Sequence, residues 1–345
     1  MGSNKLSRIK FFIGVDISKA TFNYCLRYGG GNVFNGKVGN NVESITEFIS
    51  GLKQVPNFKL RYTVFGMEVT GVYGLILIKT LAKMKAKVVV EPALRIKNSL
   101  GIIRGKNDKL DAARIARYLI KNLQELKLWV PRRKIIDELS SLSTLRERIV
   151  KVRTIMVTPL EEDDGFIDPS ISKSNIDLCQ PSINHINDLV PQIDDRIKIL
   201  WKNDVHCNRL MQIMLSVMGI GDVTALQILI HTNEFKSITT ARTFASYCGV
   251  APFEHNSGTS LNKNARVSPF ANKRIKSLLH NGVRACIPND PEIKAYYIRR
   301  VEVDKKNKMS VMNAIKFKII CRVFACVRAD RLYDRNYVSV KPNEI

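Results

Sequence analysis

The feature that most constrains the fold is a pair of short apolar runs that each end in a carboxylate. Residues 11–15 run into Asp16, and residues 62–67 run into Glu68. Short apolar runs rich in β-branched and aromatic residues predict buried strands. Because the chain carries a net charge of +24, acids in these positions are not there for solubility. A divalent-metal site that acts on phosphate explains them most economically.

The first 125 residues alternate strand and helix signals. We expect strands at 10–17, 22–27, 33–38, 61–67 and 87–90, and helices at 42–52, 73–84 and 108–122. This β-β-β-α-β-α-β-α order is that of an RNase H-like (RuvC-like) α/β domain. In that topology the first and fourth strands are parallel neighbours about 4.8 Å apart. Asp16 and Glu68 are then expected at one sheet edge, where open α/β sheets bind ligands.

Two further acids, Asp108 and Asp111, lie three residues apart and share one face of the last helix. Carboxylate oxygens are the ligands that Mg²⁺ prefers, and two Mg²⁺ ions about 3.5–4 Å apart serve phosphodiester cleavage; Mn²⁺ is the alternative ion. Each acid alone has a simpler interpretation: Asp108 as a helix cap, Asp111 as a partner of Arg114 or Lys109, and Glu68 bonded to the following turn. The four acids together favour the metal site.

The excess of positive charge predicts a polyanionic partner, most simply nucleic acid, with a solvated basic surface as the alternative. Residues 261–335 hold 18 lysines and arginines against 6 aspartates and glutamates, a net charge of +12. We therefore expect a phosphate-contacting surface in the C-terminal part. The candidate nucleic-acid-binding residues are Lys106, Gly219, Gly221, Lys263, Arg266, Lys273, Arg274 and Lys276.

The seven cysteines form no CxxC pair and no cluster with histidine at ligand spacing. This pattern argues against structural zinc and a disulfide framework, and it is typical of a reduced cytosol. No apolar stretch approaches the roughly 20 residues of a membrane span, and residues 1–10 lack the apolar core of a signal peptide. We expect a cytoplasmic protein without a membrane partner.

The middle of the chain predicts a helical coiled-coil arm. Apolar residues recur at three- and four-residue intervals over 135–156, as in a long amphipathic helix; an ordinary helix packed on its own domain is the alternative. Residues 161–181 are expected to form a polar insert or hairpin tip, and Pro191 suits the first turn of a second helix. The predicted domains are 1–130, 131–208 and 209–345, with the arm as an oligomerisation surface.

A mainly α C-terminal domain is expected after this arm. Residues 215–225, with Gly219 and Gly221, have the pattern of a helix-hairpin-helix, in which backbone N–H groups at the start of the second helix hold a phosphate. A plain helix-turn-helix connection is the competing interpretation. The basic context favours the DNA-binding one.

Six motifs together resemble those of the DEDD transposases of the IS110 insertion-sequence family, which are related to the Piv invertase. They are residues 14–19, 68–73, 106–112, 219–221, 247–252 and 256–258. Asn107 stands where this family more usually has Thr or Ser. The resemblance covers most of the chain and is weakest over 161–191.

This resemblance implies that Asp16, Glu68, Asp108 and Asp111 are the catalytic acids of a RuvC-like domain and that Ser257 is a serine nucleophile. By itself, a serine before glycine is typical of a turn; Ser260 is the second candidate. The implied activity is a transposase that cleaves and exchanges DNA strands through a phosphoserine intermediate. A structured bridge RNA and a homo-oligomer are implied partners. The alternatives are a RuvC-like hydrolytic nuclease, such as a Holliday-junction resolvase, and a non-catalytic binding module.

Overall fold

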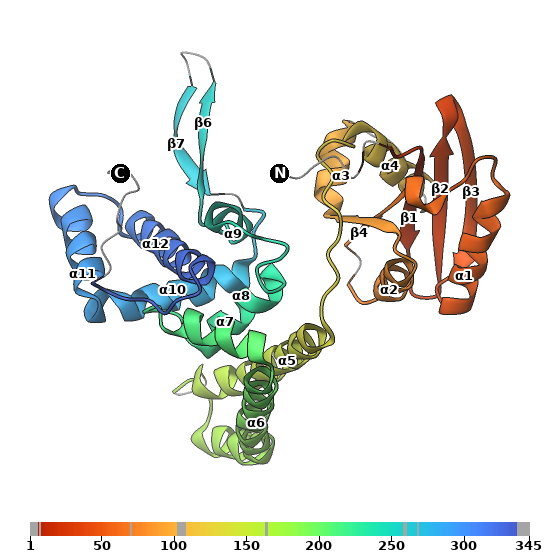
Figure 1. Cartoon of the computed structure of the whole chain (residues 1–345). Coiled ribbons are helices and arrows are strands. Elements are labelled where there is room, and N and C mark those ends of the chain that lie inside the picture. Colours follow the sequence, from red (N-terminus) through yellow and green to blue (C-terminus); the bar gives the residue numbers. More distant parts are fainter. Residues whose placement is uncertain are drawn as a thin grey trace, which may run out of the picture. The chain divides into compact units, whose positions relative to one another are not determined.

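The computed structural model describes residues 6, 8–69, 71–101, 108–162, 165–257, 261–267 and 269–336, without the side chains of residues 30, 32, 108, 109 and 253–266. The chain divides into two compact units, Met1–Pro131 and Arg132–Ile345 (Figure 1). The first unit is α/β, and the second is built mainly from helices.

A five-stranded sheet forms the centre of the first unit, in the order β3-β2-β1-β4-β5. The strands are β1 (Phe11–Ile17), β2 (Thr21–Tyr28), β3 (Asn32–Gly39), β4 (Thr63–Glu68) and β5 (Lys87–Glu91). Strands β1 to β3 form an antiparallel meander, and β4 and β5 extend the sheet parallel to β1. The prediction that the first and fourth strands are parallel neighbours is confirmed.

Helices cover both faces of this sheet. Helices α1 (Val42–Gly51) and α2 (Leu75–Lys83) share a core with Ile13, Phe65 and Val88. Helices α3 (Ala93–Leu100) and α4 (Asp108–Lys121) share one with Val64 and Val89 on the opposite face. Helix α3 has no counterpart among the predicted elements, because eight residues with one buried position give too short a periodic signal.

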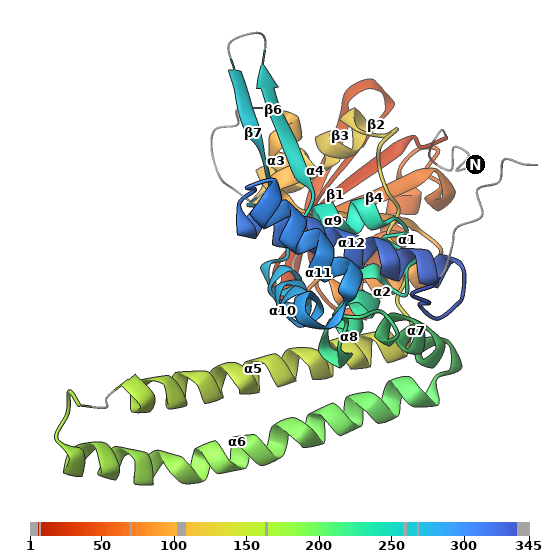
Figure 2. The same cartoon turned by 90° about the vertical axis from the view of Figure 1, so that its left-hand side faces the viewer.

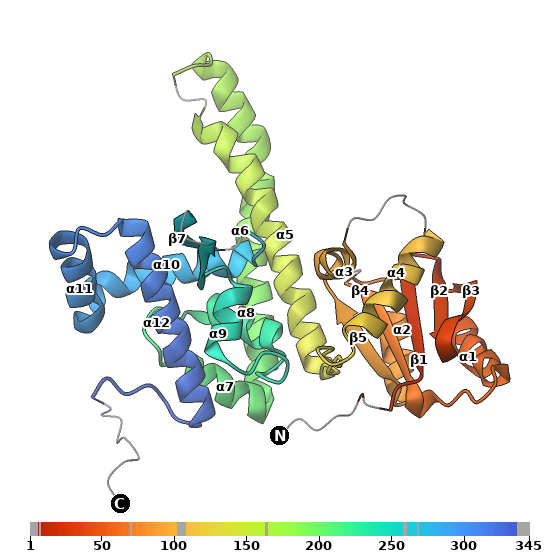
Figure 3. The same cartoon turned by 90° about the horizontal axis from the view of Figure 1, so that it is seen from above.

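The second unit begins with a two-helix arm, in which α5 (Lys134–Glu162) and α6 (Pro169–Asn203) lie side by side and antiparallel (Figures 2 and 3). Residues 169–181 are helical, so the prediction of a polar insert or hairpin tip over 161–181 is wrong for this part. Pro191 lies inside α6, which starts instead with the cap Asp168 and with Pro169. An interior proline costs a helix about 3 kcal/mol; the buried side chains of Ile186 and Ile193 on either side of Pro191 offset this cost.

The described part of this unit after the arm is mainly helical, with α7 (Val205–Leu215), α8 (Asp222–Thr232), α9 (Ala241–Tyr247), α10 (Lys273–Asn289), α11 (Pro291–Ile298) and α12 (Lys308–Arg328). A π-helical segment, Arg299–Val303, follows α11. Their core includes Met211, Leu229 and Ile319 together with Leu139 and Ile197 of the arm. The predicted boundary at 208–209 therefore falls within one continuous core.

Strands β6 (Pro252–Ser257) and β7 (Leu261–Val267) form an antiparallel hairpin that projects from these helices (Figure 1). Pro252 and Val267 are register partners at its base. None of the helices in the described part of the chain is long and apolar enough to cross a membrane.

Candidate active site

Asp16 and Glu68 occupy equivalent places on neighbouring strands. The parallel register pairs Gly14 with Gly66, and each acid follows its glycine by two residues. Because side chains alternate along a strand, each acid lies on the same face as its glycine. This is the face that α4 covers.

The two glycines allow α4 to approach the sheet closely. A Cβ atom at Gly14 would lie 2.2 Å from the carbonyl oxygen of Ala112 and 2.3 Å from the backbone nitrogen of Ala116. A Cβ atom at Gly66 would lie 2.7 Å from the side chain of Leu119. A glycine two residues before each acid thus lets α4, which carries Asp111, pack closely beside the ends of both strands. This glycine spacing is a signal in the sequence for the position of α4.

Glu68 is the centre of a cluster of negative charge. Burial raises the pKa of its carboxyl above the usual range, and the nearby charges of Asp16 and Asp111 raise it further. Asp16 and Asp111 therefore lie near enough to Glu68 for their charges to act on its carboxyl. In the described residues no three acidic, histidine or cysteine side chains are close enough to form a ready-made metal site.

Asp111 forms the ion pair with Arg114 that is the simpler interpretation of this acid. The guanidinium of Arg114 donates to Asp111 Oδ1 at 2.5 Å, one turn along α4. Asp108 is the first residue of α4, and its side chain lies outside the described residues. Arg114 thus holds one of the two carboxylate oxygens of Asp111.

Glu91 is a fifth acid at this sheet edge that the sequence pattern did not single out. It is the register partner of Glu68 on β5 and is 5% exposed. The guanidinium of Arg95 donates to both carboxylate oxygens, at 3.2 and 3.3 Å. Burial, followed by the charge of Glu91, raises the pKa of Tyr118 to about 12. Glu91 is thus an acid that Arg95 pairs, and it lies next to Glu68 at the same sheet edge.

Ser257 is the last residue of β6 and the register partner of Leu261. Its side chain is outside the described residues, as is the whole of Ser260. The hairpin belongs to the second unit, whereas the acids belong to the first.

The predicted nucleic-acid-binding residues occupy different environments. Lys106 lies outside the described residues, and Lys263 and Arg266 lie on β7 without described side chains. Lys273 is exposed at the start of α10, whereas the Arg274 guanidinium donates to Glu147 of the arm. Of the cationic candidates with described side chains, only Lys276 lines a pocket without a carboxylate among its lining residues.

The glycines of the predicted helix-hairpin-helix have a packing role. Gly219 has a φ of +87°, and a Cβ atom there would lie 2.5 Å from Cys286 Sγ and 2.9 Å from the carbonyl oxygen of Gly282. The turn between α7 and α8 therefore needs glycine to pack against α10.

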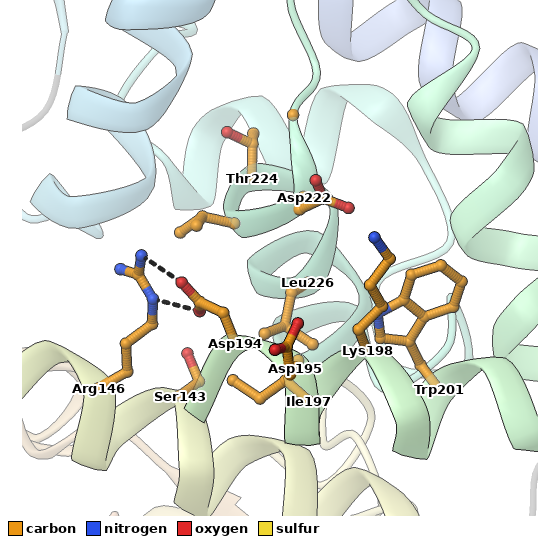
Figure 4. Close-up of a pocket in the computed structure, with 12 residues that line it drawn as sticks. Ser143, Arg146, Asp194, Asp195, Ile197, Lys198, Trp201, Asp222, Thr224 and Leu226 are labelled. Atoms are coloured by element: carbon orange, nitrogen blue, oxygen red, sulfur yellow. Dashed lines mark hydrogen bonds and ion pairs between the residues drawn. The ribbon is translucent and has the colours of Figure 1, made fainter. Parts of the chain in front are cut away.

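The start of α8 lines a pocket of about 400 Å³ at the base of the arm (Figure 4). Three carboxylates face it, from Asp194, Asp195 and Asp222, and Arg146 donates to both oxygens of Asp194 at 2.5 and 2.9 Å. A phosphate at this helix start would meet these negative charges. The phosphate-binding helix-hairpin-helix is not confirmed: the cations of Arg146 and Lys198 share this lining with the three carboxylates.

Comparison with known proteins identifies the family on both units. Residues 13–162 match the model of the DEDD transposases of IS110, and residues 211–298 match that of the transposase IS116/IS110/IS902 family. The pilin gene-inverting proteins of Moraxella bovis and Moraxella lacunata are each 28% identical over 336 residues, covering 94% of this chain and 98% of theirs. An uncharacterized 43.6 kDa protein of insertion element IS110 from Streptomyces coelicolor is 28% identical over 130 residues, 38% of this chain and 32% of its own. This chain belongs to the IS110 family of transposases.

Proposed function

We propose that this protein inserts and excises a mobile DNA element by metal-dependent strand cleavage and exchange through a phosphoserine intermediate. The observation that carries the proposal is the parallel register of β1 and β4, which places Asp16 and Glu68 on one sheet face beside α4, where the charges of Asp16 and Asp111 raise the pKa of Glu68. Like charges are gathered in this way at sites that bind a cation or transfer a proton. The basic character of the chain supplies the matching affinity for phosphate.

Asp16, Glu68 and Asp111, together with Asp108, are the residues that would hold Mg²⁺ or Mn²⁺. The site fits a divalent ion because the repulsion among these carboxylates is relieved by a cation and because carboxylate oxygens suit a hard ion. When bound, such ions supply positive charge to the phosphate oxygens in the transition state. Glycines 14 and 66 hold Asp111 in place for this role by seating α4.

Ser257 is the proposed nucleophile, with Ser260 as the second candidate. The serine hydroxyl loses its proton and bonds to phosphorus, while the bond from phosphorus to a sugar oxygen breaks and that oxygen takes up a proton. Attack by a sugar hydroxyl of another strand reverses this exchange, so no external energy source is needed for rejoining. Ser257 is the last residue of β6, in the hairpin that projects from the helices of the second unit.

The proposed partners are the DNA of the element ends and target, a structured guide RNA that pairs with them, and further copies of this chain. Base pairing by RNA would supply sequence specificity, and the protein would contribute phosphate contacts. Strand exchange needs several active sites, and the two-helix arm offers a surface for assembly.

The test uses purified protein with cognate RNA and DNA. Wild type is expected to form a protein–DNA adduct that survives denaturing electrophoresis and that disappears in Ser257→Ala. Asp16→Ala is the control that removes a carboxylate and leaves the serine in place. Full cleavage by Ser257→Ala, with no adduct in wild type, would instead favour a hydrolytic RuvC-like nuclease or junction resolvase.

A further inference from the structure

A second pocket in the helical unit carries positive charge without a matching carboxylate. It has a volume of about 820 Å³ and lies between α10, α11 and α12, at the base of the β6–β7 hairpin. Lys276 and Lys316 both line it, and Lys316 is only 3% exposed. Buried lysine normally has a carboxylate partner, because an unpaired buried charge is costly.

Neither of these two lysines forms an ion pair with an acid of the described residues. Burial lowers the pKa of Lys316, and the charge of Lys276 lowers it further. On the adjoining face of α10, burial and the charges of Lys316 and Arg284 lower the pKa of His280. The His280 Nδ1 atom is buried without a hydrogen-bond partner in the described part of the chain. The described groups that act on Lys316 and His280 are therefore cationic, and none of them is a carboxylate that would neutralise Lys316.

Lys318, a third lysine at this pocket, serves as an internal comparison. Its ammonium group donates to Glu292 Oε1 at 3.3 Å and lies 4.5 Å from the centre of the Tyr296 ring. The chain thus neutralises the more exposed lysine and leaves the buried one without a partner. Folding stability alone would favour a partner for the buried lysine rather than for the exposed one. A buried lysine without a partner is instead the pattern expected of a site for an anion.

Apart from Ser310 and Asn313, the rest of the lining is apolar or aromatic. Tyr296, Phe317 and Met309 face the same pocket as the lysines, and Phe317 is 36% exposed. A site that combines cationic groups with aromatic surface suits a nucleotide, whose phosphate takes the charges while its base contacts the rings. Duplex DNA does not offer its base faces in this way, so the match is to an unpaired strand.

The location relates this pocket to the hairpin. Pro252 and Val267, the register partners at the hairpin base, line the pocket, and Ser257 lies five residues further along β6. At about 3.4 Å per residue, this places Ser257 roughly 17 Å from the pocket along the strand. A strand bound here would be held several nucleotides away from a phosphate at the end of the hairpin.

We propose that the pocket of Lys276, Lys316, Tyr296 and Phe317 anchors one nucleotide of an unpaired nucleic-acid strand at the base of the hairpin. The proposal rests on the proposed function only in taking nucleic acid as the partner. It assigns the pocket to strand holding and not to the bond-breaking step.

The experiment compares Lys316→Met with Lys294→Met, which removes the same charge from an exposed position of α11 outside the pocket. Binding of fluorescein-labelled 12-nucleotide thymidine DNA and uridine RNA is followed by polarisation. We expect Lys316→Met to weaken binding by about tenfold or more, the loss typical of a buried phosphate contact. The salt dependence of log K should also decrease, by about 0.7. The strand with the larger loss identifies the sugar that the pocket takes.

Unfolding provides the second measurement. Without ligand, Lys316→Met should unfold at a higher temperature than wild type, because the variant removes an unpaired buried charge. Inorganic tripolyphosphate should stabilise wild type and Lys294→Met but not Lys316→Met. If Lys316→Met does not fold, the less buried Lys276→Met replaces it.

Equal oligonucleotide binding by Lys316→Met and Lys294→Met would overturn the proposal, as would stabilisation of all three proteins by tripolyphosphate to the same extent. Neither result would affect the proposed strand cleavage, which is measured separately by the Ser257 adduct.

Discussion

Two glutamates, one in each unit, have opposite pKa shifts. Glu68 in the first unit has a raised pKa, from burial and then from the charges of Asp16 and Asp111. Glu234 in the second unit has a side chain with no exposed surface, and burial alone would raise its pKa. Its pKa is nevertheless lowered, because hydrogen bonds from Arg133 and Lys236 outweigh burial.

The opposite pKa shifts mean that ionised Glu234 stabilises the fold, whereas ionised Glu68 costs stability. Arg133 donates to Glu234 at 2.9 Å and to Asp204 at 2.7 Å, and Lys236 donates to Glu234 at 2.7 Å. A lowered pKa means that Glu234 stabilises the fold above its unfolded value of about 4.5, and that this stability is lost as pH falls. A raised pKa means the reverse for Glu68, whose ionisation at neutral pH costs stability. Such a cost is retained where the charge has a function.

The largest expected effect comes from neutralising Glu68. Glu68→Gln should reduce strand cleavage by roughly 10³-fold or more, as for removal of a group on which the chemistry depends. Calorimetry should show unchanged or increased stability at neutral pH, because the substitution removes a repelled charge. Glu91→Gln is the matched control: it removes an equally placed acid that Arg95 already neutralises, so it should reduce stability and retain most activity. Equal loss of activity in both variants would contradict the assignment of different roles to Glu68 and Glu91.

Removing the cation beside Glu234 should produce the largest loss of stability. Arg133→Met leaves Glu234 buried with one fewer partner, and breaking a buried ion pair costs about 3–5 kcal/mol. Lys134→Met is the control, since this neighbouring lysine is 92% exposed and its pair with Glu138 spans 3.7 Å. Exposed pairs contribute about 1 kcal/mol or less. Urea unfolding of the two variants measures the difference, and equal losses would contradict the structural role of Glu234.

The pH dependence of stability offers a smaller test in the second unit. Burial, with the charges of Arg132 and Arg274, lowers the pKa of His231 to about 4. The hydroxyl of Tyr247 lies 2.8 Å from its Nδ1 atom. A lowered histidine pKa costs nothing above the unfolded value of about 6.5, and stability is then lost as pH falls towards 4. His231→Gln should flatten this part of the stability curve. An unchanged curve would mean that His231 is not held neutral by the fold.

The sequence predicted those parts of the molecule that depend on local patterns. The strands that carry Asp16 and Glu68 are predictable because a short apolar run is a local signal, and their parallel pairing follows from element order. Helix α6 was misplaced because Pro181 and Pro191 normally disfavour a helix interior, and packing of the arm overrides them.

Partners distant in sequence could not be predicted. Arg133 and Glu234 are 101 residues apart, and no local pattern connects them. The unpaired state of Lys316 likewise depends on which acids three helices bring near it. The spacing of glycine and acid at residues 14–16 and 66–68 was visible in the sequence, but its meaning required the contact with α4.

The most direct test of the central claim is Mn²⁺ binding to the intact protein, followed by the loss of the free-ion electron paramagnetic resonance signal. We expect binding to wild type and to Glu91→Gln, and greatly weakened binding to Glu68→Gln. Equal Mn²⁺ binding by wild type and Glu68→Gln, or equal weakening in Glu68→Gln and Glu91→Gln, would contradict the assignment of a metal site to the cluster of Asp16, Glu68 and Asp111.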